Sequence, residues 1–431
     1  MSTTAPEKYI MDPSSGVRKL NPAWKSWDQQ RQQQQAAAGQ AVTPQMPNAA
    51  TALPVVTSVD DQQKHLPGSK CAESVAASAE ILADEEVAHQ VGCSDPLQRL
   101  QALFARYEVP AGLLNKLMGL SDFQIMEMIV DDSGSMNSET DSNLPNGRPM
   151  TRWQEVHQRL TQMFEILALV PAPAIYVRFL NRPAVMDCTH THGEPPEAYL
   201  QRVITMLNQM WTQLPTGGTP ARERIQESLQ RCPGQSVLRY FFGDGVPNGG
   251  AGAAQTITQM LIRRPNPAQN PFTFLSCTNE DEAVEWMKEC EEAAPFCAEY
   301  DDFMDESREV LKDQGQAFPY TFGMHLVGQL VGAFNPNDLD ALDESAPMAK
   351  MTLDNLMGYQ SQPQEYKHYF DQFLMAQNAQ PANSAADKLK KSYIQHWMAN
   401  FQHFLQAPTA KDIPVVQQYR AQLLQLKSQG L

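Results

Sequence analysis

Short apolar runs alternate with amphipathic segments of helical period between about residues 121 and 345. The runs predict five strands, and the segments between them predict helices that keep apolar residues on one face. Such an alternation is typical of an α/β fold, in which a central, mostly parallel sheet carries helices on both faces. The predicted strands are 125–130, 175–180, 237–242, 272–276 and 296–300, and the predicted helices are 153–167, 197–210, 221–230, 251–263 and 282–292.

The regions on either side of this segment have different patterns. Residues 1–70 are rich in Pro, Gln and Ala and lack a regular period, which predicts a disordered arm. Residues 72–120 have a helical period broken at Pro110, which predicts two or three short helices. Residues 351–431 predict a helical C-terminal region, whose aromatic stripe is expected to be core, with a partner-binding groove as the alternative. The stripe comprises Tyr366, Tyr369, Phe370, Phe373, Tyr393, Trp397, Phe401 and Phe404.

Oxygen-bearing side chains gather after two of the predicted strands. Asp131, Ser133 and Ser135 stand at alternate positions directly after the first strand, so they can converge on one point. Asp244 follows the third strand, and Thr219 stands in a Gly-rich loop before a predicted helix. Ligand sites in open parallel sheets lie at the ends of strands. Carboxylates and hydroxyls are hard oxygen donors, which suit Mg²⁺.

These segments resemble the von Willebrand factor A (vWA) family, whose metal-ion-dependent adhesion site is written DxSxS, then Thr in a GGT-like loop, then Asp in a TDG-like turn. The resemblance covers about residues 123–344 and implies a Rossmann-like vWA domain. It also implies that Ser133, Ser135 and Thr219 contact Mg²⁺, or alternatively Mn²⁺ or Ca²⁺, through hydroxyls. Asp131 and Asp244 would act directly or through water. An Asp or Glu of a partner protein would complete the coordination.

Two details of the motif leave alternatives open. Thr216 competes with Thr219 as the loop ligand, and Thr219 is preferred because it directly precedes the helix. Gly243 stands where the family often has Thr or Ser. In a purely structural reading, the serines cap the turn after the first strand, and the aspartate at 244 ends its strand in a glycine turn.

Charge and cysteine content narrow the classes of partner and compartment. The 33 Lys and Arg against 49 Asp and Glu give a net charge of −16, which argues against nucleic acid and anionic membranes as partners. No apolar run approaches the roughly 20 residues of a membrane span, and the N-terminus lacks a signal-peptide pattern. Seven cysteines without a CxxC pair predict reduced thiols.

Cys188, His190 and His192 permit a transition-metal site, although an exposed hairpin or loop is the preferred interpretation.

Together these features predict a cytoplasmic protein, or an effector delivered into a host cell, that acts as a Mg²⁺-dependent protein-binding module. Adaptor and assembly factor are both compatible roles. The alternative is a structural component of a larger assembly with a vestigial metal site. An enzyme is not expected, because the chain lacks G-x-S-x-G, a P-loop and the second aspartate of a DxD phosphatase. A metal-dependent phosphoryl hydrolase is the least favoured reading.

Overall fold

The computed structural model describes residues 9–11, 18–20 and 96–428, apart from 145–146, 279, 337, 340–341 and 343–344. The chain divides into two compact units, Met1–His65 and Leu66–Leu431. In the first unit, β1 (Tyr9–Met11) pairs antiparallel with β2 (Arg18–Leu20). The predicted disorder of residues 1–70 otherwise falls outside the described residues, as do the predicted helices before residue 96.

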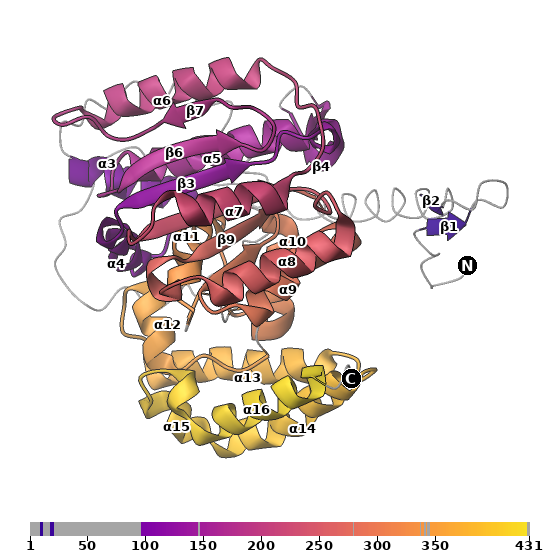
Figure 1. Ribbon diagram of the computed structural model, residues 1–431. Helices are drawn as coiled ribbons and strands as arrows, with labels where there is room; N and C mark the ends of the chain where they lie inside the picture. Colours follow the sequence, from indigo (N-terminus) through magenta and orange to yellow (C-terminus); the bar gives the residue numbers. More distant parts are fainter. Residues whose placement is uncertain are drawn as a thin grey trace. The chain divides into compact units, whose positions relative to one another are not determined.

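Six strands of the second unit form one sheet in the order β10-β9-β8-β3-β6-β7 (Figure 1). All neighbours are parallel except the short edge strand β7, which is antiparallel to β6. The predicted mostly parallel central sheet is therefore confirmed, and each predicted strand agrees with an observed one to within one residue at each end. The strands are β3 (Ile125–Val130), β6 (Ala174–Phe179), β7 (Val185–Asp187), β8 (Val237–Gly243), β9 (Phe272–Ser276) and β10 (Cys297–Tyr300).

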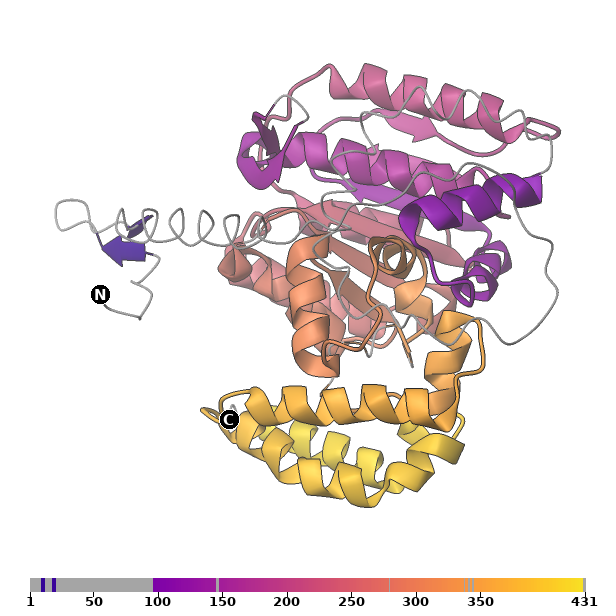
Figure 2. The ribbon, with the colours of Figure 1, turned by 180° about the vertical axis from the view of Figure 1, so that it is seen from behind.

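Helices cover both faces of the sheet, as Figures 1 and 2 show from opposite sides. On one face, Met128 of β3 belongs to the same core as Leu160, Val203 and Leu326 from α5, α6 and α11. On the other face, the core joins strand residues to α7, α8 and α9. The helices are α5 (Arg152–Leu167), α6 (Pro196–Trp211), α7 (Ala221–Arg231), α8 (Gly250–Arg263), α9 (Asp281–Ala293), α10 (Phe303–Gln314) and α11 (Phe322–Val331).

The winding of the chain reverses at β3. From β3 it runs to β6 and β7 on one side, and it then crosses to β8 on the other side. Ligands of such sheets bind where the winding reverses, at the carboxyl ends of the strands. An antiparallel ribbon of β4 (Glu139–Asn143) and β5 (Pro149–Thr151) lies between β3 and α5 in the chain and was not predicted. The short 3-10 helices are Gly119–Asp122, Gly134–Asn137, Pro267–Gln269, Gly332–Phe334 and Ala410–Asp412.

The N-terminal and C-terminal helices share the core of the sheet. The core on the α5 side includes Leu113 and Leu117 of α4 as well as Phe373 and Trp397 near the C-terminus. The predicted core role of the C-terminal aromatic stripe is therefore confirmed for its buried members. These helices are α3 (Pro96–Tyr107), α4 (Leu113–Met118), α12 (Lys350–Met357), α13 (Pro363–Ala379), α14 (Ala385–Ala399), α15 (Phe401–Gln406) and α16 (Pro414–Ser428).

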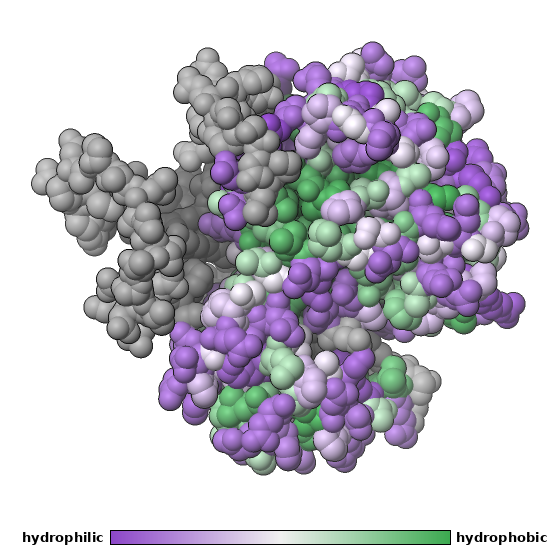
Figure 3. Space-filling model, turned by 90° about the vertical axis from the view of Figure 1, so that its left-hand side faces the viewer, coloured by the Kyte–Doolittle hydropathy of each residue, from purple (hydrophilic) through white to green (hydrophobic). Residues whose placement is uncertain are grey.

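The described surface is mixed in polarity. On the face drawn in Figure 3, hydrophobic residues gather near the middle, and hydrophilic residues lie above, below and to the right of them. The most exposed large apolar side chains are well separated along the chain: Leu214 lies in the loop between α6 and α7, Met375 on α13 and Leu424 on α16. Among the described residues, no helix combines the length and the hydrophobicity that crossing a membrane requires.

Candidate functional site

The candidate site lies at the carboxyl ends of β3 and β8. Asp131 directly follows β3, and its backbone N–H donates to the carbonyl of Phe242 on β8 (2.8 Å). Asp244 directly follows β8. Both carboxylates are buried, with Asp131 0% and Asp244 2% exposed. Because β3 and β8 are parallel neighbours, their following residues meet at one edge of the sheet.

The two serines of the DxSxS segment join these carboxylates. The Ser133 backbone N–H donates to Asp131 Oδ1 (2.8 Å), and the hydroxyl oxygens of Ser133 and Ser135 lie 3.0 Å apart. The Ser135 hydroxyl donates to Asp244 Oδ1 (2.8 Å). Four of the five predicted site residues are thus linked in one chain of hydrogen bonds.

The loop that carries Thr219 lies beside these serines. The Gly217 carbonyl accepts from the Gly134 backbone N–H (3.1 Å), which fastens the loop to the turn after β3. Gly217 has φ +98°, and a Cβ there would lie 2.8 Å from Asn181 Oδ1, so the position requires glycine. Thr219 is buried and is separated from α7 by the N-cap residue Pro220, whereas Thr216 is exposed. The loop is thus fastened to the turn after β3 through its backbone, and of the two threonine candidates the preferred one is buried.

One oxygen of Asp131 is buried without compensation. Asp131 Oδ2 has no hydrogen-bond partner, although the side chain is inaccessible to solvent. Burial, followed by repulsion from the Asp244 carboxylate, raises the pKa of Asp131 to about 7. An ionised carboxylate in this position is costly unless a cation neutralises it. This unmatched oxygen is the strongest local evidence for a cation site.

Arg152 is a member of the site that the sequence interpretation missed. Its guanidinium Nη1 lies 2.8 Å from Asp244 Oδ2, and its Nη2 lies 2.8 Å from Glu280 Oε1. Arg152 is the first residue of α5, directly after the capping Thr151. A cation in the first turn of a helix opposes the helix dipole, and this was the available signal. Arg152 therefore neutralises part of the charge at the edge of the site.

The neighbouring Asp132 is engaged elsewhere. Its Oδ1 accepts from the Asn181 backbone N–H (2.7 Å), and its Oδ2 lies 3.0 Å from Arg182 Nε. This leaves two carboxylates, those of Asp131 and Asp244, beside the serine hydroxyls. Across the described ranges, no three His, Cys, Asp or Glu side chains form a group that could hold a metal ion. Any metal here depends on hydroxyls for the remaining protein ligands.

The glycine that departs from the family pattern has a steric explanation. A Cβ at Gly243 would lie 2.5 Å from Cε1 of Phe241 and 3.3 Å from Cε of Met287. Real Cβ atoms do not approach carbon atoms at the shorter distance. The ring of Phe241 therefore fills the space that a serine or threonine side chain would need at this turn.

The alternative Cys188, His190 and His192 arrangement does not converge. Cys188 is buried in the core on the α5 side, where burial raises its pKa to about 12. The ring of His190 stacks on Tyr199, with ring centroids 3.6 Å apart, and His192 is exposed. A transition-metal site at these residues is therefore not supported by their placement.

Comparison of the sequence with protein-family models found no match, and no curated protein matches it either. The chemistry of the site consequently has to be argued from its own residues. Two carboxylates and up to three hydroxyls are hard oxygen donors, which fit Mg²⁺ better than a thiophilic metal. The buried, unmatched oxygen of Asp131 fits the same ion.

Proposed function

We propose that this chain is a protein-binding module that captures a carboxylate of a partner protein through Mg²⁺. Asp131, Ser133, Ser135, Thr219 and Asp244 would hold the ion, as the resemblance to vWA domains implies. The observation that carries the proposal is the buried Asp131 Oδ2, which lacks a partner beside a second carboxylate. Bound Mg²⁺ would supply a Lewis acid that attracts one further anionic oxygen.

The charge of the residues favours an open position on the ion. Two aspartates balance the formal charge of Mg²⁺, and the Arg152 guanidinium withdraws part of the negative charge of Asp244. Hydroxyl oxygens donate weakly, so the ion retains affinity for another carboxylate. The net charge of −16 opposes an acidic partner at long range, so the attraction has to be local to the ion.

One observation favours a second candidate, a structural component with a vestigial metal site. Arg152 already provides Asp244 with a cation at 2.8 Å, as a guanidinium does when it replaces a metal. In this reading Asp131 is held neutral and the site only joins β3 to β8. The two candidates differ in whether the site takes up a divalent ion.

One experiment with Mn²⁺ tests both metal uptake and carboxylate capture. Water bound to Mn²⁺ increases the relaxation rate of the solvent protons, which is the measured quantity. Wild type should bind Mn²⁺, and added acetate should displace water and lower the relaxation enhancement, whereas acetamide should not. Asp131→Asn and Ser135→Ala should lose the ion. Asp122→Asn provides the matched control, because this exposed aspartate precedes β3 at its other end. Equal Mn²⁺ binding by wild type and Asp131→Asn would refute the assignment.

A further inference from the structure

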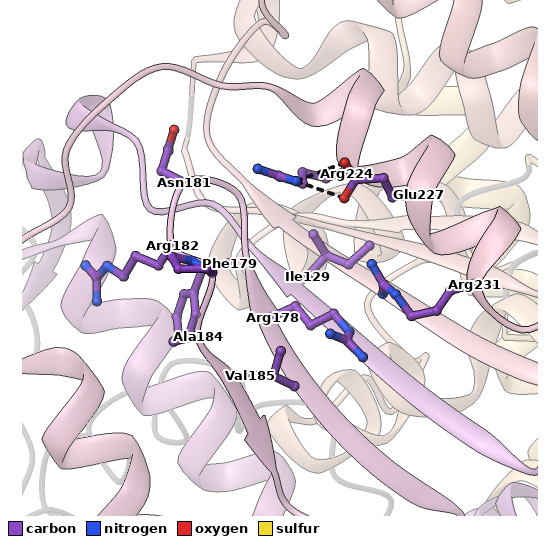
Figure 4. Close-up of a pocket in the computed structure, with 11 residues that line it drawn as sticks. Ile129, Arg178, Phe179, Asn181, Arg182, Ala184, Val185, Arg224, Glu227 and Arg231 are labelled. Atoms are coloured by element: carbon purple, nitrogen blue, oxygen red, sulfur yellow. Dashed lines mark hydrogen bonds and ion pairs between the residues drawn. The ribbon is translucent and has the colours of Figure 1, made fainter.

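A hollow of about 210 Å³ opens beside the edge strands of the sheet (Figure 4). Residues of β6, β7 and the turn between them form one wall, and α7 forms the other. Ile129 of β3 lies at its base. This hollow is separate from the proposed metal ligands, although Asn181 at its rim also bonds the Gly218 carbonyl in the Thr219 loop (2.9 Å).

The hollow lies where none of the described helices covers the sheet. Side chains of β6 alternate, so Ile175, Val177 and Phe179 join the core on the α5 side, whereas Arg178 faces the side of α7. Arg178 is paired with Val185 of β7, which is 46% exposed. The sheet face beyond Ile129 is therefore open to solvent and combines apolar with basic groups.

Three guanidinium groups surround this space. Arg178 Nε lies 2.7 Å from Glu127 Oε1, and Arg231 Nη1 also contacts that oxygen. Arg224 Nη1 bonds Glu227 Oε2 at 2.8 Å. In Figure 4, Arg178 and Arg231 extend into the space between β6 and α7, whereas Arg182 points away from them. Arg182 instead contacts Asp132 and the ring of Trp153.

The charges in the hollow do not cancel. Glu127 and Glu227 neutralise two of the three guanidiniums, and Asp132 neutralises Arg182 separately. One positive charge remains, in a chain whose net charge is −16. Within the described residues, the two Nη groups of Arg178 donate no hydrogen bond, so its planar fork is available for a bidentate bond.

We propose that this hollow binds the carboxylate of a ligand that also carries a small apolar body. A single negative charge matches the single spare guanidinium, whereas a doubly charged phosphate would leave one charge unmatched. The volume of about 210 Å³ exceeds that of a lone carboxylate and leaves room for apolar atoms against Ile129 and Val185. This inference goes beyond the proposed metal-dependent function and does not depend on it.

The test measures binding of 4-methylpentanoate to the full chain in EDTA, by titration of the ligand's NMR signals. The matched amide, 4-methylpentanamide, and inorganic phosphate serve as comparison ligands. The acid should bind at least about tenfold more tightly than the amide, because charge-assisted bonds to arginine are stronger than neutral ones. Phosphate should bind more weakly than the acid.

Variants separate the hollow from the rest of the surface. Arg178→Gln should weaken acid binding at least about tenfold, because it removes the available fork while Arg231 still pairs with Glu127. Val185→Trp should block the space without changing the charge. Arg222→Gln is the control, since this exposed arginine lies on α7 outside the hollow and pairs with Glu223. Equal binding of acid and amide, unchanged binding by Arg178→Gln and Val185→Trp, or tighter binding of phosphate would each overturn the proposal. EDTA keeps this result independent of the metal test.

Discussion

Replacement of Asp131 by Asn should stabilise the metal-free protein while it abolishes metal binding. The pKa of Asp131 is about 7 in the folded protein against the usual 3.8, and one pKa unit corresponds to about 1.4 kcal/mol. Ionised Asp131 therefore costs the folded state roughly 4 kcal/mol above pH 7, as an order of magnitude. The asparagine carries no charge and still offers an oxygen to the Ser133 backbone N–H.

The sign of this effect depends on pH in a defined way. Because the folded pKa of Asp131 is raised, folding favours the protonated form, and stability falls as the pH rises from about 4 to about 7. The advantage of Asp131→Asn should consequently be small near pH 4 and full near pH 8. Excess Mg²⁺ should narrow this difference, since an ion at a hundredfold its dissociation constant adds about 2.7 kcal/mol to wild type alone.

Urea unfolding followed by tryptophan fluorescence, in EDTA and in Mg²⁺, measures these differences. Asp132→Asn is the matched contrast, because Arg182 and the Asn181 N–H bind that carboxylate and its loss should destabilise the fold. If Asp131→Asn is less stable than wild type in EDTA at pH 8, the carboxylate at 131 is compensated and the argument for a cation fails.

Three further substitutions test the electrostatics and packing around the sheet. Arg152→Gln removes the cation from buried Asp244 and should cost about 3 kcal/mol in EDTA, with part of the loss recovered in Mg²⁺, as thermal unfolding would measure. Burial lowers the pKa of His325 well below its usual value, so below pH 6.5 the unfolded chain gains a proton that the folded chain does not. Between pH 6.5 and 5, the wild-type free energy of unfolding should therefore fall by up to about 1.4 kcal/mol per pH unit from this residue, and urea unfolding of His325→Gln should lack this decrease. Gly243→Ser places a Cβ 2.5 Å from Phe241 Cε1 and should cost about 1 to 3 kcal/mol in the same assay.

The strands were predictable because their burial on both faces produces continuous apolar runs. Residues 125–130 and 272–276 coincide with β3 and β9, where five of six and all five residues are buried. The edge strand β7 was not predicted, because its pattern of one buried residue between two exposed ones is too short to be distinctive. The ribbon of β4 and β5 is mostly exposed and carries no apolar alternation.

The sequence could predict only those site residues whose motif directly follows a predicted strand. Asp131, Ser133, Ser135 and Asp244 follow strands that the apolar pattern locates, so their meeting follows from strand adjacency. The place of Arg152 in the first turn of a helix was a local signal, but its partner could not be assigned, because Asp244 lies far along the chain and only the folded sheet brings them together. Contacts of this kind depend on tertiary structure and leave no local period.

The position of β3 in the middle of the sheet has a consequence for the nascent chain. β3 leaves the ribosome before any of its neighbours, yet β8, which closes one of its sides, begins only at Val237. Helix α3, which is synthesised earlier, packs against α11, which is synthesised later still. A Cβ at Gly323 of α11 would lie 2.3 Å from the Tyr107 carbonyl, so the two helices meet in backbone contact. Apolar surface of the early segments therefore stays open until α11 has been synthesised, which exposes the nascent chain to premature aggregation and to chaperones.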